Sequence, residues 1–563
     1  MFRETDRHTQ LDAFSSADSL LSGRSLSFYQ DKSSWHNLFR KEVLMRLDEG
    51  IFRVLFCKDN GAPNVSVRVL VCMMILKESQ GLSDAQLFEQ CRYNILTRSA
   101  LGLVNITDSI PAESTYYLFR NRIVEYEKEK GENLLEKAFR QVTLGQIKDY
   151  NVSGKQLRMD SKLICSNISW YSRYELIHET VRIFYKNREE YIKKRSLPAS
   201  DIALLESLSK ENGDKVVYRS SKEDITIRMK QLGVLIHRLL NLFKKYPGDD
   251  YDTLKKVFEE QFSVGKKKEI LPLEKEQIKA TSVQSPHDTD CDFRNKDGNK
   301  VKGYSVNVSE TCDKGKDKLN LVTDVQVDKV TTADCDFLAS SVDNSQEILT
   351  DKIEKVHTDG AYHSPENQDF CKEKEIEFIT SAIQGAEPRY ELSFDENNEE
   401  LIVKDRKTEQ IIPAKKITSR KDESVTKWVI KTSDNKSRYF TEKDVKSSIL
   451  RQKISQTPRD ELNIRNNVEA TIFQLGYHYP NDKSRYRTLC KHKMWAFMRV
   501  IGINFRRILK YVTQICQRPF FMLNTITSNH IEHVYLTFII IFNHIFTYDF
   551  SRNSKKQVFP VFL

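Results

Sequence analysis

The order of strand-like and helical patterns between residues 157 and 380 constrains the fold of this chain most strongly. Residues 157–164 alternate as a β-strand does, and residues 174–268 then show the apolar spacing of long, charge-rich helices. Strand patterns return at 291–306, 319–327, 355–359 and 376–380, and helical patterns at 334–352 and 365–374 separate the last three of them. This order predicts a mixed α/β core at 146–388 that carries a helical insertion at about 174–275.

Two local patterns support this reading. Asp297 and Gly298 separate two strand-like segments as a two-residue hairpin turn does. In the helical insertion one face is apolar, formed by Ile225, Met229, Leu232, Leu235 and Leu239. The charged remainder of these helices is usually a solvated face, and the alternative is an arm that lies along DNA.

Residues 1–145 are predicted to form a helical module. A helix over 66–79 ends at Gly81, and Ser83 with Gln86 has the capping-box spacing for a second helix over 84–93. Ser114 is expected to cap a third helix, which carries Arg120 and Arg122. Helix, glycine turn and helix resemble a helix-turn-helix DNA-binding unit, although most such helix pairs only pack together.

The part after residue 388 is predicted to hold an insertion and then the end of the core. Residues 389–455 read as a β-rich insertion, because polar and apolar residues alternate among many turn residues. A helix is expected over 463–476 with Glu469 in its middle, within a final core segment at 456–515. The apolar tail at 516–563 has no assigned role. Its most apolar run, 534–546, is shorter than the roughly 20 residues of a membrane-spanning helix, so we expect a core or dimer contact.

Composition excludes several classes of protein. Of 563 residues, 39% are hydrophobic and 30% are charged, which predicts several folded units rather than a disordered chain. The ten cysteines lie singly along the chain, so neither a zinc ribbon nor a disulfide framework is predicted and a reducing cytosol is expected. The first residues lack the apolar core of a signal peptide.

Positive charge is concentrated near the end of the predicted core. The net charge of +10 is modest, but residues 483–510 contain many Lys and Arg residues and no Asp or Glu. Tyr486, Trp495 and Phe497 lie among them. This segment is therefore a candidate phosphate-facing surface. Trp495 and the distant Trp428 are nevertheless more often packing residues than platforms for bases.

Three acidic residues occupy positions that such a core can bring together. Asp160 lies within the first strand, Asp359 ends the fourth, and Glu469 lies on the helix after the fifth. Phosphoryl transfer on DNA uses carboxylates to hold two Mg²⁺ ions about 4 Å apart and needs little covalent chemistry from the protein. Because the chain has 79 acidic residues, a chance selection is the alternative, and the neighbouring residues must decide.

Those neighbouring residues resemble bacterial insertion-sequence transposases of the DDE class, in the subgroup with a compact helical N-terminal module. Residues 159–168 and 358–362 are similar to the family's two aspartate segments, and 285–288 with 303–304 look like its hairpin. Arg465 precedes Glu469 by four residues, as in the family. Further similar segments lie at 81–84, 101–103, 119–122, 485–487 and 504–507, so the resemblance covers roughly residues 2–510.

The resemblance implies a ribonuclease-H-like core in which Asp160, Asp359 and Glu469 are the catalytic carboxylates. They would bind two Mg²⁺ ions, for which Mn²⁺ substitutes. It also implies a homodimer that binds double-stranded DNA, as terminal inverted repeats and as target, at a cytoplasmic, nucleoid-associated location and without a membrane. DNA contacts are expected from basic residues of both ends of the chain, namely Arg120, Arg122, Arg465, Arg485, Arg487, Lys491, Lys493, Arg506 and Arg507.

Two positions depart from the family pattern. Leu462 stands where the family has a tyrosine, and Gly476 stands where it has a lysine. Two rival functions also stay open. One is a ribonuclease-H-like nuclease without strand transfer, which needs neither the N-terminal module nor the β-rich insertion. The other is a catalytically inactive DNA-binding protein derived from such a transposase.

Overall fold

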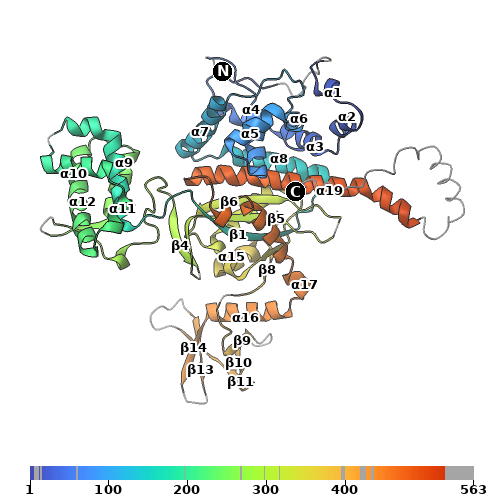
Figure 1. Ribbon diagram of the computed structural model, residues 1–563. Helices are drawn as coiled ribbons and strands as arrows, with labels where there is room; N and C mark the ends of the chain where they lie inside the picture. Colours follow the sequence, from blue (N-terminus) through green and yellow to red (C-terminus); the bar gives the residue numbers. More distant parts are fainter. Residues whose placement is uncertain are drawn as a thin grey trace.

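The computed structural model describes residues 1–526 except 6–11, 13–14, 59–60, 196, 267–268, 297, 316, 384, 395–399, 419–425 and 433–435, with side chains described to residue 514. The apolar run at 534–546 therefore lies outside the described residues. Figure 1 shows a central sheet, an N-terminal helical module above it, and two insertions that project from the sheet region. The long helix α19 (Leu489–Ile526) passes between the N-terminal helices and the sheet.

The central sheet is mixed. Strand β5 pairs antiparallel with β1 along one edge and with β4 and then β6 along the other, while β7 lies parallel to β1 and β8 parallel to β7. The predicted strands are confirmed, although the third begins at Val322 rather than at residue 319. The bounds are β1 (Gln156–Cys165), β4 (Asp292–Lys296), β5 (Asn299–Thr311), β6 (Val322–Lys329), β7 (Lys355–Thr358) and β8 (Glu377–Thr380).

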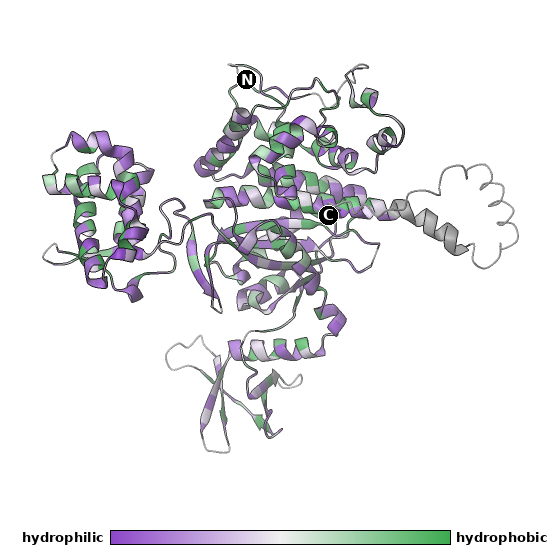
Figure 2. Cartoon of the chain, viewed as in Figure 1, coloured by the Kyte–Doolittle hydropathy of each residue, from purple (hydrophilic) through white to green (hydrophobic). Residues whose placement is uncertain are grey.

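The β4–β5 hairpin turns where the sequence predicts it. Lys296 pairs with Asn299, and Gly298 has a φ of +86°, a left-handed value that glycine adopts without a steric penalty. Asp297 lies outside the described residues. The helices α14 (Leu338–Ile348) and α15 (Pro365–Glu373) connect β6 to β7 and β7 to β8, as expected. In Figure 2, hydrophobic residues gather along the central strands and the helices beside them.

Helix α19 is the layer that joins the sheet to the N-terminal module. It packs against β5 and β6 on one side and against α4 (Val67–Gln80) and α8 (Leu134–Tyr150) on the other. Trp495 and Arg499 are fully buried, and Arg499 donates to the main-chain carbonyls of Gln474 and Glu78. Tyr486, Trp495 and Phe497 are buried, because the N-terminal helices cover the segment 483–510 on one side and the sheet covers it on the other, so none of these rings faces solvent. That the basic residues of the segment face phosphate stays a prediction.

The N-terminal module is helical, as predicted. Helix α5 (Asp84–Tyr93) begins with the expected capping box of Ser83 and Gln86, and Gly81 ends α4 with a φ of +67°. Helix α7 (Glu113–Lys130) begins after Pro111 with Ala112 at the cap position, so the prediction of a Ser114 cap is wrong. The other helices of the module are α1 (Ala17–Leu20), α2 (Gly23–Gln30), α3 (Trp35–Glu42) and α6 (Ile95–Ala100).

The helical insertion has a hydrophobic core of its own. The predicted apolar face of α12 (Lys222–Phe243) is buried in this core, except that Ile225 is only partly buried. The helical pattern ends at Gln261, and a short hairpin of β2 and β3 follows, so the predicted helical stretch was too long. The elements are α9 (Arg173–Lys193), α10 (Ala199–Lys210), α11 (Gly213–Arg219), α12 (Lys222–Phe243), α13 (Asp249–Gln261), β2 (Phe262–Val264) and β3 (Ile270–Pro272).

The second insertion is β-rich, as the alternating pattern indicates. Two three-stranded sheets and helix α16 share a small core that contains Trp428, which is a packing residue here. Its elements are β9 (Tyr390–Phe394), β10 (Leu401–Asp405), β11 (Ile411–Pro413), β12 (Lys415–Thr418), β13 (Thr426–Lys431), β14 (Ser437–Thr441) and α16 (Glu442–Gln456). No helix in the described part of the chain is long and apolar enough to cross a membrane.

Because β5 lies close to β1 at Gly303, we expect any larger residue at this position to destabilise the protein. A Cβ atom there would lie 2.0 Å from the carbonyl oxygen of Ile164, a clash that only a shift of the backbone can relieve. We expect Gly303→Ala to lower the free energy of unfolding by about 1–3 kcal/mol and to lower the melting temperature. Ser305→Ala is the control, because the buried Ser305 hydroxyl has no hydrogen-bond partner in the described structure. Equal melting temperatures for both variants would contradict the prediction.

Candidate active site

Two of the three predicted carboxylates meet through the pairing of parallel strands. Arg158 of β1 is paired with His357 of β7, so two residues further along Asp160 is level with Asp359 on the same face of the sheet. Asp359 follows β7 directly and caps a short 3₁₀ turn, where its Oδ1 accepts from the amide of Ala361 at 2.9 Å. The strand register therefore brings together two acids that are far apart in the sequence.

Glu469 reaches the same place from helix α18 (Val468–Gly476), which packs against β1. The single helix expected over 463–476 is broken, because a 3₁₀ turn over Arg465–Asn467 precedes α18. Glu469 consequently lies in the first turn of α18 and not in the middle of a longer helix. Its side chain is 63% exposed, whereas that of Asp160 is 12% exposed.

Arg465 connects the three acids. Its Nη2 lies 2.7 Å from Oδ2 of Asp160 and 3.9 Å from Oδ2 of Asp359, and its Nη1 lies 3.1 Å from Oε1 of Glu469. The three carboxylates thus converge on one guanidinium, and each belongs to a different element. Of the nine predicted DNA-contact residues, Arg465 is the one that lies with the acids.

A fourth carboxylate borders this group. Asp334, at the start of the turn before α14, accepts a hydrogen bond from Ser161. The pKa of Asp160 is raised to about 6, chiefly by burial and also by the charges of Asp359 and Asp334, against the lowering effect of Arg465. Asp334 does not stand out in the sequence, because a single aspartate before a helix is ordinarily only a cap.

The chemistry of the donors suits a hard cation, but their present arrangement does not hold one. Carboxylate oxygens are the ligands that Mg²⁺ takes in proteins. Within the described residues, however, no three His, Cys, Asp or Glu side chains form a group that could coordinate one ion. The Arg465 guanidinium lies among the carboxylates and balances part of their charge. A divalent ion could use these oxygens only after Arg465 has moved.

The buried Glu310 of β5 holds the elements around the acids in position. Its Oε1 accepts from Nε of Arg158 at 2.6 Å, and its Oε2 accepts from Thr471 and Arg507, each at 2.6 Å. Arg158 also donates to the carbonyl of Ile464, just before Arg465. Burial opposes ionisation of Glu310, but Arg507 and Arg158 hold its pKa below the usual value. Arg507, expected to contact DNA, is therefore engaged inside the protein.

Most of the other predicted DNA-contact residues lie where the N-terminal module meets the core. Arg120 pairs with Asp84 and lies over two tyrosine rings, and Arg485 donates to the carbonyls of Gly81 and Leu82. The remaining ones are distributed around them: Arg487 donates to Asn167, Lys493 pairs with Glu127, Arg122 lies over Phe56, Lys491 is half-buried, and Arg506 lies further along α19.

Three of these residues, Arg120, Arg487 and Lys491, form a cluster at this junction together with Lys128, which the sequence did not single out. Burial lowers the pKa of Lys491, and the positive charges of Arg120, Lys128 and Arg487 lower it further. Like charges held this close repel one another, so an anion that bound here would relieve the repulsion. We refer to these four residues as the junction cluster.

Three of the segments that resemble the family, 159–168, 285–288 and 303–304, are joined by hydrogen bonds. Asp288 is fully buried and accepts from the hydroxyl groups of Ser166 and Tyr304, the latter at 2.6 Å. The segments that follow β1, precede β4 and lie within β5 are thereby joined. These hydrogen bonds help to fix β1, β4 and β5 relative to one another.

The network around Glu310 predicts a large loss of stability on its neutralisation. Glu310→Gln keeps the shape of the side chain but leaves Arg158 and Arg507 without their buried counterion, so we expect a loss of about 3–5 kcal/mol. Thermal unfolding and hydrogen exchange over residues 465–476 measure it.

Glu354→Gln is the matched control, because Glu354 forms an exposed pair with Lys155 and exposed pairs contribute about 0–1 kcal/mol. A similar small effect for both variants would refute the role of Glu310.

Comparison with known families gives one match. Residues 29–122 match a family model described as a transposase domain (DUF772). The matched segment runs from the end of α2 into α7, within the N-terminal module. No curated protein and no solved structure matches the chain. The match supports the assignment of this chain to a transposase family.

Proposed function

We propose that the chain is a DNA transposase of the DDE class, which binds the terminal inverted repeats of an insertion sequence and catalyses metal-dependent strand cleavage and strand transfer. One observation carries the proposal. Asp160, Asp359 and Glu469 converge on Arg465 from three separate elements. The transposase-domain match at residues 29–122 supports it independently, because that segment contains none of these four residues.

The topology of the sheet is compatible with a ribonuclease-H-like core. Strands β6, β5, β1, β7 and β8 are neighbours in that order, and β5 runs opposite to the others. Helices connect the last three strands in the chain, and α18 then returns to β1. Such a core would present Asp160 and Asp359 at one edge and Glu469 above them.

Each residue of the site would have a separate role in the reaction. Two Mg²⁺ ions, or Mn²⁺ in their place, supply an activated oxygen nucleophile and stabilise the leaving oxygen when bound. Asp160 and Asp359 would provide ligands from the sheet and Glu469 a ligand from α18. Arg465, once released from the carboxylates, presents a planar guanidinium that suits bidentate binding of a DNA phosphate. Cutting both ends of an element in one complex would require a dimer.

The junction cluster is a candidate DNA surface. Its four residues come from α7, from the segment before α19 and from the first turn of α19, so DNA bound there would contact both the N-terminal module and the core. Binding by phosphate contacts is independent of base sequence. Recognition of a particular inverted repeat would then come from other residues of the N-terminal module.

A second candidate function has one observation in its favour. Arg465 engages all three carboxylates, and no metal-binding group is complete among the described residues. A catalytically inactive DNA-binding protein descended from a transposase would have no need to release Arg465. A nuclease without strand transfer is the remaining alternative, and the same assay separates all three.

Asp359→Ala is expected to abolish cleavage. A labelled DNA end taken from the flanks of the coding region is incubated with the protein, Mg²⁺ and a plasmid target. We expect a loss of at least about 100-fold, roughly 3 kcal/mol of transition-state stabilisation. Asp343→Ala is the control, since Asp343 lies on α14 and forms an exposed pair with Lys374.

The products decide between the alternatives. Cleavage with joining to the plasmid supports the transposase, and cleavage without joining supports a nuclease. Binding without cleavage by the unaltered protein supports the inactive form. Unchanged activity of Asp359→Ala would refute the site.

Binding of Mn²⁺ is expected to compete with a proton and with Arg465. Because metal ligands must be deprotonated and the pKa of Asp160 is raised to about 6, Mn²⁺ affinity should fall as the pH decreases below about 6. Arg465→Gln removes the competing cation, so at pH 7.5 it should bind Mn²⁺ about tenfold more tightly, about 1.4 kcal/mol. Titration calorimetry without DNA measures both effects. Weaker binding by Arg465→Gln would contradict the displacement of Arg465.

A further inference from the structure

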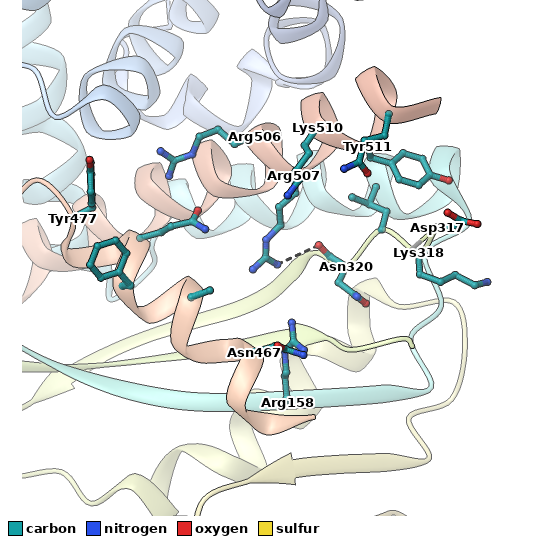
Figure 3. Close-up of a pocket in the computed structure, with 15 residues that line it drawn as sticks. Arg158, Asp317, Lys318, Asn320, Asn467, Tyr477, Arg506, Arg507, Lys510 and Tyr511 are labelled. Atoms are coloured by element: carbon teal, nitrogen blue, oxygen red, sulfur yellow. Dashed lines mark hydrogen bonds between the residues drawn. The ribbon is translucent and has the colours of Figure 1, made fainter. Parts of the chain in front are cut away.

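A cavity of about 1130 Å³ lies beside the candidate active site, between α18, α19 and the loop before β6. Figure 3 shows Arg506, Arg507 and Lys510 on α19 along one side of it, with Asn467 and Arg158 on the opposite side. Asn467 belongs to the turn that carries Arg465, two residues before Glu469. The cavity therefore adjoins the helix that presents the third carboxylate, and it is not part of the carboxylate group itself.

The cavity has an excess of positive charge. Arg158 and Arg507 share the single negative charge of Glu310. No described residue forms an ion pair with Lys318, Arg506 or Lys510, which also line the cavity. Asp317 is the acidic residue of the lining. A cavity with three unneutralised cations favours an anionic ligand.

Arg506 offers hydrogen-bond donors that an anionic ligand could use. Its Nε and Nη2 are buried and have no hydrogen-bond acceptor within the described structure. Burial and the neighbouring Arg507 both lower the pKa of Arg506, since each disfavours its charge. A buried guanidinium without an acceptor carries a free-energy cost that a bound anion, or water, would reduce.

Two exposed aromatic side chains form the edge of the same cavity. Phe473 is 62% exposed and Tyr477 is 59% exposed, and their rings contact each other with centroids 5.5 Å apart. Aromatic rings beside cationic side chains are the usual binding surface for unpaired nucleotides, because bases stack on the rings while phosphates bind the cations. Duplex DNA has its bases stacked on one another and could use only the cations.

The aromatic pair is aligned with the candidate active site. Arg465, Glu469, Phe473 and Tyr477 follow one another at intervals of four residues, so they lie along one side of α18 and its preceding turn. A helix rises 1.5 Å per residue, which separates Glu469 from Tyr477 by about 12 Å along the axis. That distance corresponds to roughly three stacked nucleotides.

We propose that this cavity binds unpaired DNA nucleotides that lead away from the carboxylate site, with bases stacked on Phe473 and Tyr477 and phosphates bound by Arg506 and Lys510. The inference rests on the proposed function, which supplies DNA as the ligand. It adds that the strand next to the reacting phosphate is held single-stranded by the protein.

The test measures binding by the full-length protein without metal, so that no cleavage occurs. The probes are a fluorescein-labelled 12-nucleotide single strand and the corresponding duplex, and the readout is fluorescence anisotropy. We expect the double variant Phe473→Ala, Tyr477→Ala to raise the Kd for the single strand about tenfold, within the range for the loss of one stacked base, and to change the Kd for the duplex less than twofold. Tyr218→Ala is the control, because Tyr218 is 91% exposed on α11 in the helical insertion.

The contribution of the cationic residues is measured separately, from the salt dependence of binding. Lys510→Gln and Arg506→Gln should each reduce the slope of log Kd against log salt concentration for the single strand by about 0.7. Lys510 is exposed, so its variant keeps the test valid if Arg506→Gln does not fold. Lys215→Gln on α11 is the control and should leave the slope unchanged.

Two results would overturn the proposal: an unchanged Kd for the single strand in the aromatic variant, or an equal loss for single strand and duplex. The outcome is independent of catalysis. If the protein cleaves no DNA but the single-strand effects appear, the cavity is a nucleotide site in an inactive protein. If it cleaves DNA and the aromatic variant binds normally, the transposase proposal stands and the cavity proposal fails.

Discussion

Glu310 is the buried charge on which the arrangement of the site depends. It lies on β5, and its two oxygens hold Arg158 of β1, Thr471 of α18 and Arg507 of α19. A carboxylate in this position is stable only because two guanidinium groups balance it and a hydroxyl completes its hydrogen bonds. Four elements from distant parts of the chain are therefore held in one geometry, and α18 can present Glu469 to the sheet.

Helix α19 extends this constraint to the N-terminal module. The helix is apolar on several sides because it lies between two layers, and Arg499 satisfies carbonyl groups at the ends of α4 and α18. Tyr486, just before the helix, is bound by Glu78 and Lys77 of α4. Motion of the N-terminal module relative to the carboxylates would have to break these buried contacts. DNA bound at the junction cluster would for the same reason have a defined position relative to the site.

Arg465 balances only part of the negative charge of the carboxylate site. The Arg465 guanidinium lies between the carboxylates, where a bound metal ion would have to lie. Release of Arg465 would free the carboxylates and would provide a cation for DNA. The adjoining cavity has the opposite imbalance, since Lys318, Arg506 and Lys510 have no counterions in the described structure. A DNA strand that enters the cavity would supply the missing negative charge close to where Arg465 must leave the acids.

The sequence by itself determined the local elements and the candidate acids. Strand alternation, helical spacing and the Ser83 capping box depend on neighbouring residues, so they could be predicted, and the local motifs singled out Asp160, Asp359 and Glu469. Only the tertiary structure decided that Trp495 is buried, that Arg507 serves Glu310, and that Asp334 and the aromatic pair adjoin the site. The contacts of Arg507 with Glu310 and of Asp334 with Ser161 join residues more than a hundred positions apart, which no local pattern encodes.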